Sequence, residues 1–236
     1  MIYLPDMTRI IAPLLLALVL QPAAPKAGPW KSLFDGKSMD AWRIFKTDRA
    51  PKMCETPGAK DCWEIVDGVL QKDGHANDIA SKDQFGDFEF ELEWKIGDAS
   101  NSGLFYRGTD EFNQIYWSAP EYQLLDNVNA ADNKKENHLA GSVYDLYAVP
   151  KDAAKANEWN TTRIVAKGPH VEHWLNGKKV ASYDVGSADW DAAIKQSKFS
   201  AEKYPNFGKA PKGYLGIQGD HPGTLALRNI RIRELQ

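Results

Sequence analysis

The fold is decided by the stretch Asn160-Thr-Thr-Arg-Ile-Val-Ala-Lys-Gly-Pro-His-Val-Glu-His-Trp-Leu-Asn-Gly-Lys-Lys-Val-Ala-Ser-Tyr183. Apolar and polar side chains alternate along it, which is the pattern of strands that bury one face. Asn176-Gly177 stands between two such runs, and a two-residue loop of this type supplies the positive φ angles that a tight hairpin needs. The stretch therefore predicts three antiparallel strands, over 160–167, 170–175 and 179–183.

The same alternation recurs on both sides of this stretch, between turns rich in Gly, Asn, Asp and Pro. Asp67-Gly68 predicts a second tight hairpin, and one helix is expected over 188–197 inside an insertion that runs to about Lys212. The remaining predicted strands are Trp63–Val66, Val69–Lys72, Phe88–Ile96, Gly103–Arg107, Glu121–Leu125, Gly141–Leu146, Gly213–Gln218 and Leu225–Glu234. This pattern favours an all-β sandwich of two antiparallel sheets, in a single domain over residues 28–236.

The N-terminus predicts export. Arg9 precedes the apolar run Ile10–Leu20, and a small, Pro-rich stretch follows it, so residues 1–27 are interpreted as a signal peptide with an approximate cleavage site. That run is too short to span a bilayer, and no later run is long enough, so no membrane span is expected. Cys54 and Cys62 are the chain's two cysteines, and a periplasmic or secreted location would let them form a disulfide.

Charge and motifs exclude several classes of function. The formal net charge is −3 with Lys and Arg scattered along the chain, so no nucleic-acid partner is expected. The sequence contains no G-x-S-x-G, H-E-x-x-H or phosphate-binding loop, and no G-x-G-x-x-G that follows a strand. Serine hydrolase, zinc protease and nucleotide-dependent activities therefore have no support.

Alternation also predicts what the non-core faces of the strands carry. Glu121 and Gln123 share one face of their strand, Asn101, Phe105 and Arg107 share one face of theirs, and Tyr214 and Gln218 do so in a third. Aromatic rings beside amides, carboxylates and Arg are the composition that binds sugars. The solvated side of an antiparallel sheet would have the same composition. A sugar-binding face and a merely solvent-exposed face therefore both stay open as interpretations.

Several segments, taken in chain order, resemble the 3-keto-disaccharide hydrolase family. They are Leu33–Lys37 with Trp42, Trp63–Leu70, Asn101–Arg107, Glu121–Asp126, Ala140–Leu146, Glu158–Thr161, Lys167–Gly177 and Leu227–Leu235. The resemblance implies a concanavalin A-like jelly-roll sandwich, a periplasmic location, and a glycoside substrate whose sugar ring carries a ketone at carbon 3. The segment Ile217-Gln-Gly-Asp-His-Pro-Gly223 departs from the family's Leu-Gln-Asp-His-Gly by one residue, and the Cys54–Cys62 loop is not part of the family pattern.

A ketone at carbon 3 acidifies the proton on carbon 2, so one base and one stabiliser of the enolate suffice for elimination of the leaving group. Glu121 is the candidate base, although a surface carboxylate paired with an Arg would look the same in sequence. Arg107 is the candidate stabiliser, or else that structural partner. His173 could act as acid, base or metal ligand, although beside Val171 and Leu175 it could equally be a packing residue. His221 follows a strand end and Asp220, which suits a mobile acid or a metal ligand, although most loop histidines have no such role.

Substrate hydrogen bonds are expected from Asn101, Gln123, Asp126, Tyr144 and Gln218. A divalent cation that polarises the substrate oxygens is chemically attractive, but no His, Asp or Glu cluster has diagnostic ligand spacing. The partner predicted by this reading is an oligosaccharide or glycoside. Two rival functions remain, a non-catalytic carbohydrate-binding module and a protein-interaction domain.

Overall fold

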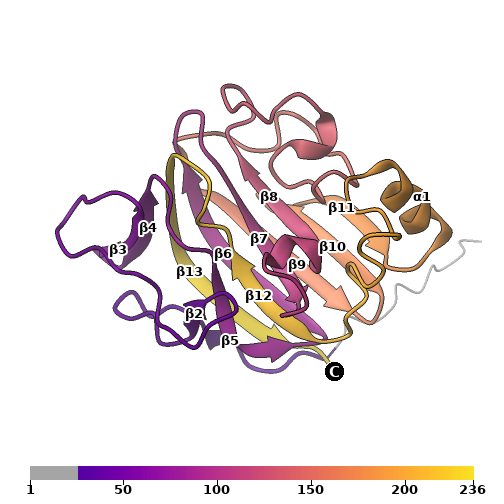
Figure 1. Cartoon of the computed structure of the whole chain (residues 1–236), viewed down its shortest axis with the longest axis horizontal. Helices are drawn as coiled ribbons and strands as arrows, with labels where there is room; N and C mark the ends of the chain where they lie inside the picture. Colours follow the sequence, from indigo (N-terminus) through magenta and orange to yellow (C-terminus); the bar gives the residue numbers. More distant parts are fainter. Residues whose placement is uncertain (1–25) are drawn as a thin grey trace, which may run out of the picture.

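The computed structural model describes residues 26–236, which form two antiparallel sheets packed face to face (Figure 1). Residues 1–25 of the predicted signal peptide lie outside the described residues. The larger, eight-stranded sheet has the order β11-β10-β9-β6-β13-β4-β3, with β1 paired to β13. Its strands are β1 (Lys31–Ser32), β3 (Cys62–Val66), β4 (Val69–Asp73), β6 (Phe88–Ile96), β9 (Asn160–Lys167), β10 (His170–Leu175), β11 (Lys178–Asp184) and β13 (Thr224–Glu234).

The second sheet has five strands in the order β2-β5-β12-β7-β8. They are β2 (Trp42–Ile44), β5 (Ile79–Phe85), β7 (Asn101–Gly108), β8 (Glu121–Leu125) and β12 (Gly213–Ile217). The other elements are the short 3-10 helices η1 (Ile115–Trp117) and η2 (Glu136–His138) and the helix α1 (Ala188–Gln196). The predicted sandwich is confirmed.

Both predicted hairpins form as the sequence indicates. Asn176 and Gly177 have φ angles of 50° and 78° between β10 and β11, and Asp67 and Gly68 have 51° and 77° between β3 and β4. Helix α1 begins after Ser187, whose hydroxyl accepts a hydrogen bond from the Trp190 backbone N–H at 3.1 Å. Trp190 and Ile194 are its buried residues, so the amphipathic helix is also confirmed.

The prediction of a strand over 141–146 is wrong. Gly141 and Asp145 take positive φ angles of 92° and 58°, which breaks the extended backbone, and Val143 makes only isolated bridges to Tyr122 and Tyr147. The alternation there arises because Val143 is fully buried in the core while the chain turns around it. Strands β1, β2 and β5 are not among the predicted strands, because they are short or lack regular alternation.

The core lies between the sheets and contains the inward side chains predicted from the alternation. Leu104 and Tyr106 of β7, Leu215 of β12, and Tyr122 and Leu124 of β8 all belong to one buried cluster. The opposite face of the five-stranded sheet is covered by loops. Phe105 and Ala80 on that face pack with Ile115 and Ala119, which lie in residues 109–120 between β7 and β8, the η1 segment.

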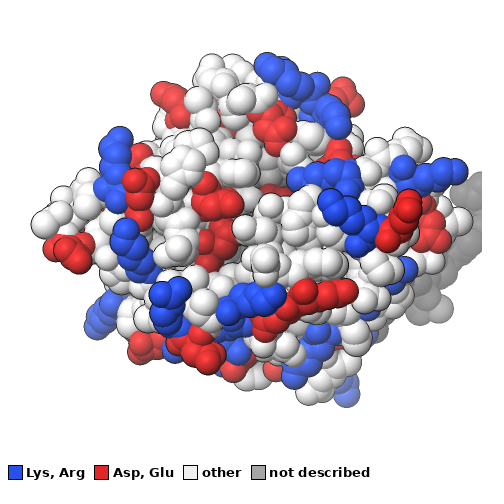
Figure 2. All heavy atoms as spheres, viewed as in Figure 1, with Lys and Arg blue, Asp and Glu red and all other residues white. Residues whose placement is uncertain are grey.

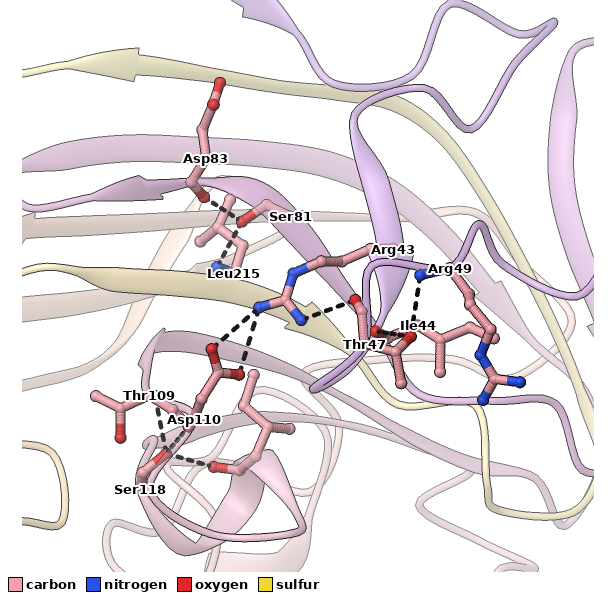
Figure 3. Close-up of polar contacts among 11 residues, drawn as sticks. Arg43, Ile44, Thr47, Arg49, Ser81, Asp83, Thr109, Asp110, Ser118 and Leu215 are labelled. Atoms are coloured by element: carbon pink, nitrogen blue, oxygen red, sulfur yellow. Dashed lines mark hydrogen bonds and ion pairs between the residues drawn. The ribbon is translucent and has the colours of Figure 1, made fainter.

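The η1 segment is fastened to the sheet by Arg43, a buried residue of the edge strand β2 (Figure 3). Its guanidinium donates to Asp110 at 3.3 and 3.4 Å and to the Thr47 carbonyl at 3.2 Å, and it stacks over the Tyr214 ring at 4.4 Å. Ser118 closes the segment by donating to the Ile115 carbonyl at 3.1 Å. These contacts hold η1 above β7 and β12.

The predicted disulfide joins Cys54 and Cys62. The segment that carries Cys54 runs beside β3, where the Cys54 N–H donates to the Trp63 carbonyl at 2.8 Å and the Trp63 N–H donates to the Lys52 carbonyl at 3.0 Å. Among residues 26–236, no helix is long and apolar enough to cross a lipid bilayer.

We expect the double variant Cys54→Ser and Cys62→Ser to lose about 2–3 kcal/mol of unfolding free energy, because the bond closes a short loop in the unfolded chain. Urea unfolding of oxidised wild type, reduced wild type and the variant measures this. Reduced wild type should match the variant, and equal stability of all three would contradict the prediction.

Candidate active site

The outer face of the five-stranded sheet gathers the polar side chains that the alternation placed together. Glu121 and Gln123 lie on β8, Asn101 begins β7, and Gln218 follows β12. Strand β7 lies between β8 and β12, so these residues converge across three neighbouring strands. Glu121, Gln123 and Gln218 are 5%, 1% and 4% exposed, which shows that this face is sealed under loops rather than simply solvated.

Glu121 lies directly over the glycine of the next strand. A Cβ atom at Gly103 would stand 2.0 Å from Glu121 Oε1, so only a glycine leaves room for the carboxyl. The Gln123 amide donates to Asn101 Oδ1 at 3.1 Å, and in its flipped orientation it would donate to Glu121 Oε1 at 3.0 Å and to the Ser102 carbonyl at 3.2 Å. The Glu121 carboxyl therefore lies between Gly103 of the next strand and the Gln123 amide of its own strand.

Burial raises the pKa of Glu121 to about 8. Lys198 acts in the opposite direction, while the negative charges of Asp78, Asp132 and Asp220 raise the pKa further. Glu121 is accordingly mostly protonated at neutral pH and becomes a base in mildly alkaline solution. A carboxyl with this property in a covered site is typical of a catalytic acid or base.

Acidic side chains surround the loop between β12 and β13. Figure 2 shows Asp and Glu gathered near the middle of the face that the five-stranded sheet presents, around this loop. Asp78 accepts hydrogen bonds from the backbone N–H groups of Gly219 and Asp220 at 2.8 and 3.1 Å. Burial, followed by the charge of Asp220, raises the pKa of Asp78 to about 6. A hollow of about 220 Å³ opens beside Asp78 and Asp220.

The loop is held from beneath by Lys72, which is 3% exposed. Its ammonium donates to the carbonyls of Gly74, His221 and Gly223 at 2.9, 2.7 and 3.1 Å. Burial lowers its pKa to about 8, against the opposing effect of Asp220. The His221 side chain is 43% exposed and stands 3.7 Å from Asp220, and burial of the ring lowers its pKa. His221 thus lies at the rim of the site.

Three buried oxygens near this loop have no hydrogen-bond partner among the described residues: Asp78 Oδ2, Asp220 Oδ1 and Gln218 Oε1. Carboxylate and amide oxygens of this kind suit a hard divalent cation. However, no group of three or more His, Cys, Asp or Glu side chains in residues 26–236 is placed to hold a metal ion. Any cation here would depend on the amide oxygen and on substrate or water ligands.

The opposite wall is a network centred on His138. Its ring bonds Asp132 at 2.8 Å and Asp145 at 3.0 Å and stacks on Tyr144, with centroids 4.4 Å apart. Tyr144 donates its hydroxyl to Asp132 at 2.8 Å, and its backbone N–H donates to the Glu121 carbonyl at 3.0 Å. Burial, together with the bond to Asp132, raises the pKa of Tyr144. The Tyr144 hydroxyl therefore stays neutral and donates to Asp132, while its backbone is tied to Glu121.

Three predicted site residues are engaged elsewhere. Arg107 has a φ angle of 53°, and its guanidinium donates to the carbonyls of Gly86 and Gly168 at 2.9 and 2.7 Å and to Asp87 at 3.2 Å. The expectation that it shares the face of Glu121 is wrong, because the left-handed backbone turns its side chain to the end of the sheet.

His173 and Asp126 likewise have partners outside this face. His173 is fully buried in the core, with its ring 2.8 Å from the Tyr106 hydroxyl and 2.9 Å from the Gly141 carbonyl. Burial lowers its pKa to about 4, so the ring is neutral at neutral pH. Asp126 accepts from the N–H groups of Ala99 and Val128 at 2.8 and 3.0 Å and thereby caps the loop after β8.

Sequence reasoning missed the residues that come from loops. Asp78, Asp132, His138, Asp145 and Lys198 lie in segments without periodic patterning, so no spacing connects them to Glu121. A groove of about 970 Å³ on the eight-stranded sheet contains none of the predicted residues. Its tryptophans Trp30 and Trp174 are already stacked with Arg231 at 4.4 Å and Arg163 at 4.1 Å.

The substitution Glu121→Gln should stabilise the protein in alkaline solution. The folded state keeps a proton that the unfolded chain releases, so wild-type stability falls as pH rises from about 4.5 to about 8 and stays low above that. The neutral amide avoids this loss, which is on the order of a few kcal/mol. Urea unfolding near pH 4 and pH 9 tests it, with Glu91→Gln as a control on the other sheet. An equal effect of Glu121→Gln at both pH values would contradict the prediction.

The substitution Gly103→Ala should displace the Glu121 carboxyl, because the new methyl group would stand 2.0 Å from Oε1. We expect a loss of about 1–3 kcal/mol in unfolding free energy and a lower pKa of Glu121, read by carbon NMR of labelled Glu. Gly28→Ala, whose Cβ would meet its nearest atom at 3.4 Å, is the control. An unchanged Glu121 pKa in Gly103→Ala would show that the glycine is not needed.

Comparison with known proteins agrees with this geometry. Residues 29–233 match the family model described as the 3-keto-alpha-glucoside-1,2-lyase-like domain. A 3-keto-disaccharide hydrolase of Bacteroides thetaiotaomicron is 34% identical over 235 residues, which cover 86% of this chain and 78% of the relative. Both descriptions denote enzymes.

Solved structures show the same sandwich. A protein of Parabacteroides distasonis assigned as a glycosyl hydrolase superposes with a TM-score of 0.73 at 29% identity, covering 88% of this chain and 94% of that one. The GH16 endo-beta-1,3(4)-glucanase SCLam has a TM-score of 0.53 at 9% identity, over 90% of this chain and 96% of that one, and shares the fold alone. The chain belongs to the 3-keto-alpha-glucoside-1,2-lyase-like domain family.

Proposed function

We propose that this protein cleaves glycosides whose sugar ring carries a ketone at carbon 3, with Glu121 as the base. The observation that carries the proposal is the buried Glu121 carboxyl, whose pKa is raised to about 8 by burial. It stands among amide and hydroxyl groups in a chain whose family and relative are described by 3-keto-glucoside chemistry. Proton abstraction beside a ketone needs one such base.

The reaction proceeds by elimination and addition. Glu121 removes the proton from carbon 2, and the electron pair passes through the enolate to form the double bond between carbons 1 and 2. The bond from carbon 1 to the leaving oxygen breaks, and that oxygen takes a proton at the rim, where His221 stands beside Asp220. Water then adds its hydroxyl to carbon 1 and gives its other proton to the group at the rim that protonated the leaving oxygen, while Glu121 returns a proton to carbon 2. One water is consumed and no redox change occurs.

The other predicted residues divide into two roles. Asn101, Gln123 and Gln218 lie on the three strands around Glu121, and with the Tyr144 hydroxyl, which now donates to Asp132, they would hydrogen-bond the sugar hydroxyls. In contrast, Arg107, His173 and Asp126 are positioning residues, because their polar atoms already bond the Gly86 and Gly168 carbonyls, the Gly141 carbonyl, and the Ala99 and Val128 N–H groups. The Cys54–Cys62 bond supports a location outside the cytoplasm.

A carbohydrate-binding module is the principal alternative, and the environment of Glu121 argues against it. Binding a neutral sugar needs hydrogen-bonding groups and aromatic platforms, but it gains nothing from a carboxyl whose ionisation is suppressed. A protein-interaction domain is less favoured still, because the polar face lies beneath the η1 segment and the loop of Tyr144 instead of at the surface.

The decisive test uses a 3-keto-glucoside with a chromogenic leaving group, beside the same glucoside without the ketone. Wild type should release the chromophore from the 3-keto-glucoside and not from the glucoside without the ketone. In D2O, the recovered sugar should carry deuterium at carbon 2. Glu121→Gln should lower kcat by about 100-fold or more, while Glu91→Gln should match wild type. Saturable binding without release by wild type would make the protein a carbohydrate binder.

The pH dependence gives a separate prediction. Because the base must be ionised and the Glu121 pKa is about 8, kcat/KM should rise with pH and level off above about 8. A profile measured from pH 5 to 10 tests this. A profile that instead falls as pH rises through 8 would make Glu121 a general acid.

A further inference from the structure

Lys198 presents an unusual ammonium group at the site. Its side chain is exposed, and its Nζ atom has no hydrogen bond or ion pair with any residue in the part of the chain that the structure describes. The carboxylates of the opposite wall are all engaged by other donors. Its backbone N–H, by contrast, is tied to Asp145 Oδ2 at 2.8 Å. The Asp145 carboxylate thus fixes the backbone of Lys198, while its side-chain ammonium has no polar partner among the described residues.

Aromatic rings hold the free ammonium in place. Nζ lies 4.4 Å from the ring centre of Tyr144, 5.5 Å from Tyr116, 5.8 Å from Trp117 and 5.2 Å from Phe199. Ring faces attract a cation but accept no strong hydrogen bond from it. All the N–H donors of this ammonium therefore remain available for an incoming oxygen atom.

Two of these rings tie Lys198 to Glu121. Tyr144 donates its backbone N–H to the Glu121 carbonyl, and Tyr116 packs against Phe105, the cross-strand partner of Glu121, with ring centres 6.5 Å apart. The ammonium thus contacts two residues of which one is hydrogen-bonded to Glu121 and the other packs against its cross-strand partner. In agreement, Lys198 is the charge that most lowers the Glu121 pKa.

We propose that the Lys198 ammonium is a second catalytic group, which donates a hydrogen bond to the oxygen on carbon 3 and stabilises the enolate that forms when Glu121 removes the proton from carbon 2. This role rests on the proposed function. Lys198 also takes the place of Arg107 as the source of positive charge, because the Arg107 guanidinium is turned to Gly86 and Gly168.

The charges balance through this step. As the bond between carbon 2 and its hydrogen breaks, the electron pair moves to the carbon 3 oxygen, which becomes an oxyanion facing the ammonium. When the leaving group departs, the pair returns to form the double bond between carbons 1 and 2, and the ketone is restored. Lys198 keeps its proton throughout. An electrostatic donor of this type is typically worth 100- to 1000-fold in kcat, as a rough guide.

Lys203 offers a matched control. Its ammonium also lies over aromatic rings, 5.4 Å from Trp117 and 5.2 Å from Tyr204, but the positive charge that chiefly shifts the Glu121 pKa is that of Lys198. The titratable groups that face Lys198 are Glu121 on β8, Tyr116 of η1, Asp132, Tyr144 and Asp145 of the opposite wall, and His221 of the β12–β13 loop.

The test compares wild type with Lys198→Met, Lys198→Arg and Lys203→Met. Each is assayed for chromophore release from the 3-keto-glucoside and for deuterium exchange at carbon 2 of a 3-keto sugar that has no leaving group. We expect Lys198→Met to lower both rates by about 100-fold or more, with Lys198→Arg partly restoring them and Lys203→Met unchanged. The variant keeps the backbone bond to Asp145, and thermal unfolding checks that it is folded.

A second readout separates catalysis from packing. Removal of the positive charge should raise the pKa of Glu121, so the pH profile of the residual activity moves upward in Lys198→Met and not in Lys203→Met. If wild type is active and Lys198→Met exchanges the carbon 2 proton within about 3-fold of wild type, the role of Lys198 is overturned and the proposed function stands. Wild type that neither releases nor exchanges overturns both.

Discussion

The site depends on the desolvation of one carboxyl. Glu121 lies over Gly103 on a sheet face that would ordinarily be wet, and three loops come together to keep water from it. Each loop is fastened by a buried polar residue at some distance: Arg43 holds the η1 segment to Asp110, Lys72 holds the β12–β13 loop through carbonyls, and His138 joins Asp132 to Asp145. All three contacts keep water away from the two oxygen atoms of the Glu121 carboxyl.

The position of that carboxyl is set by the opposite face of the same strand. Tyr122 and Leu124 of β8 are buried in the core, and the Tyr122 hydroxyl donates to the Trp174 carbonyl of β10 at 3.2 Å. Because successive residues of a strand point to opposite faces, packing between the sheets fixes the direction in which Glu121 points. The core thus holds this strand in register, and the buried His173 is part of that core.

Sequence alone predicted what strand periodicity controls. It located the two hairpins, the sandwich, and the common face of Glu121, Gln123 and Gln218, because each follows from local turn chemistry or from period-two alternation. It misplaced Arg107, since a single left-handed backbone angle reverses a side chain without leaving a mark in the pattern. It missed Asp132, Asp145 and Lys198 because loop positions are set by long-range contacts. For the same reason it could not decide whether the polar face of the sheet was open or covered.

The segment that pairs beside β3 covers the edge of the eight-stranded sheet. An outermost strand with unpaired backbone groups is a template for pairing with another chain, and residues 52–54 occupy that position on β3. The Cys54–Cys62 bond locks this cover in place only after oxidation. A chain kept in a reducing compartment would hold the cover loosely and be prone to self-association, so oxidative folding both completes the domain and guards it against aggregation.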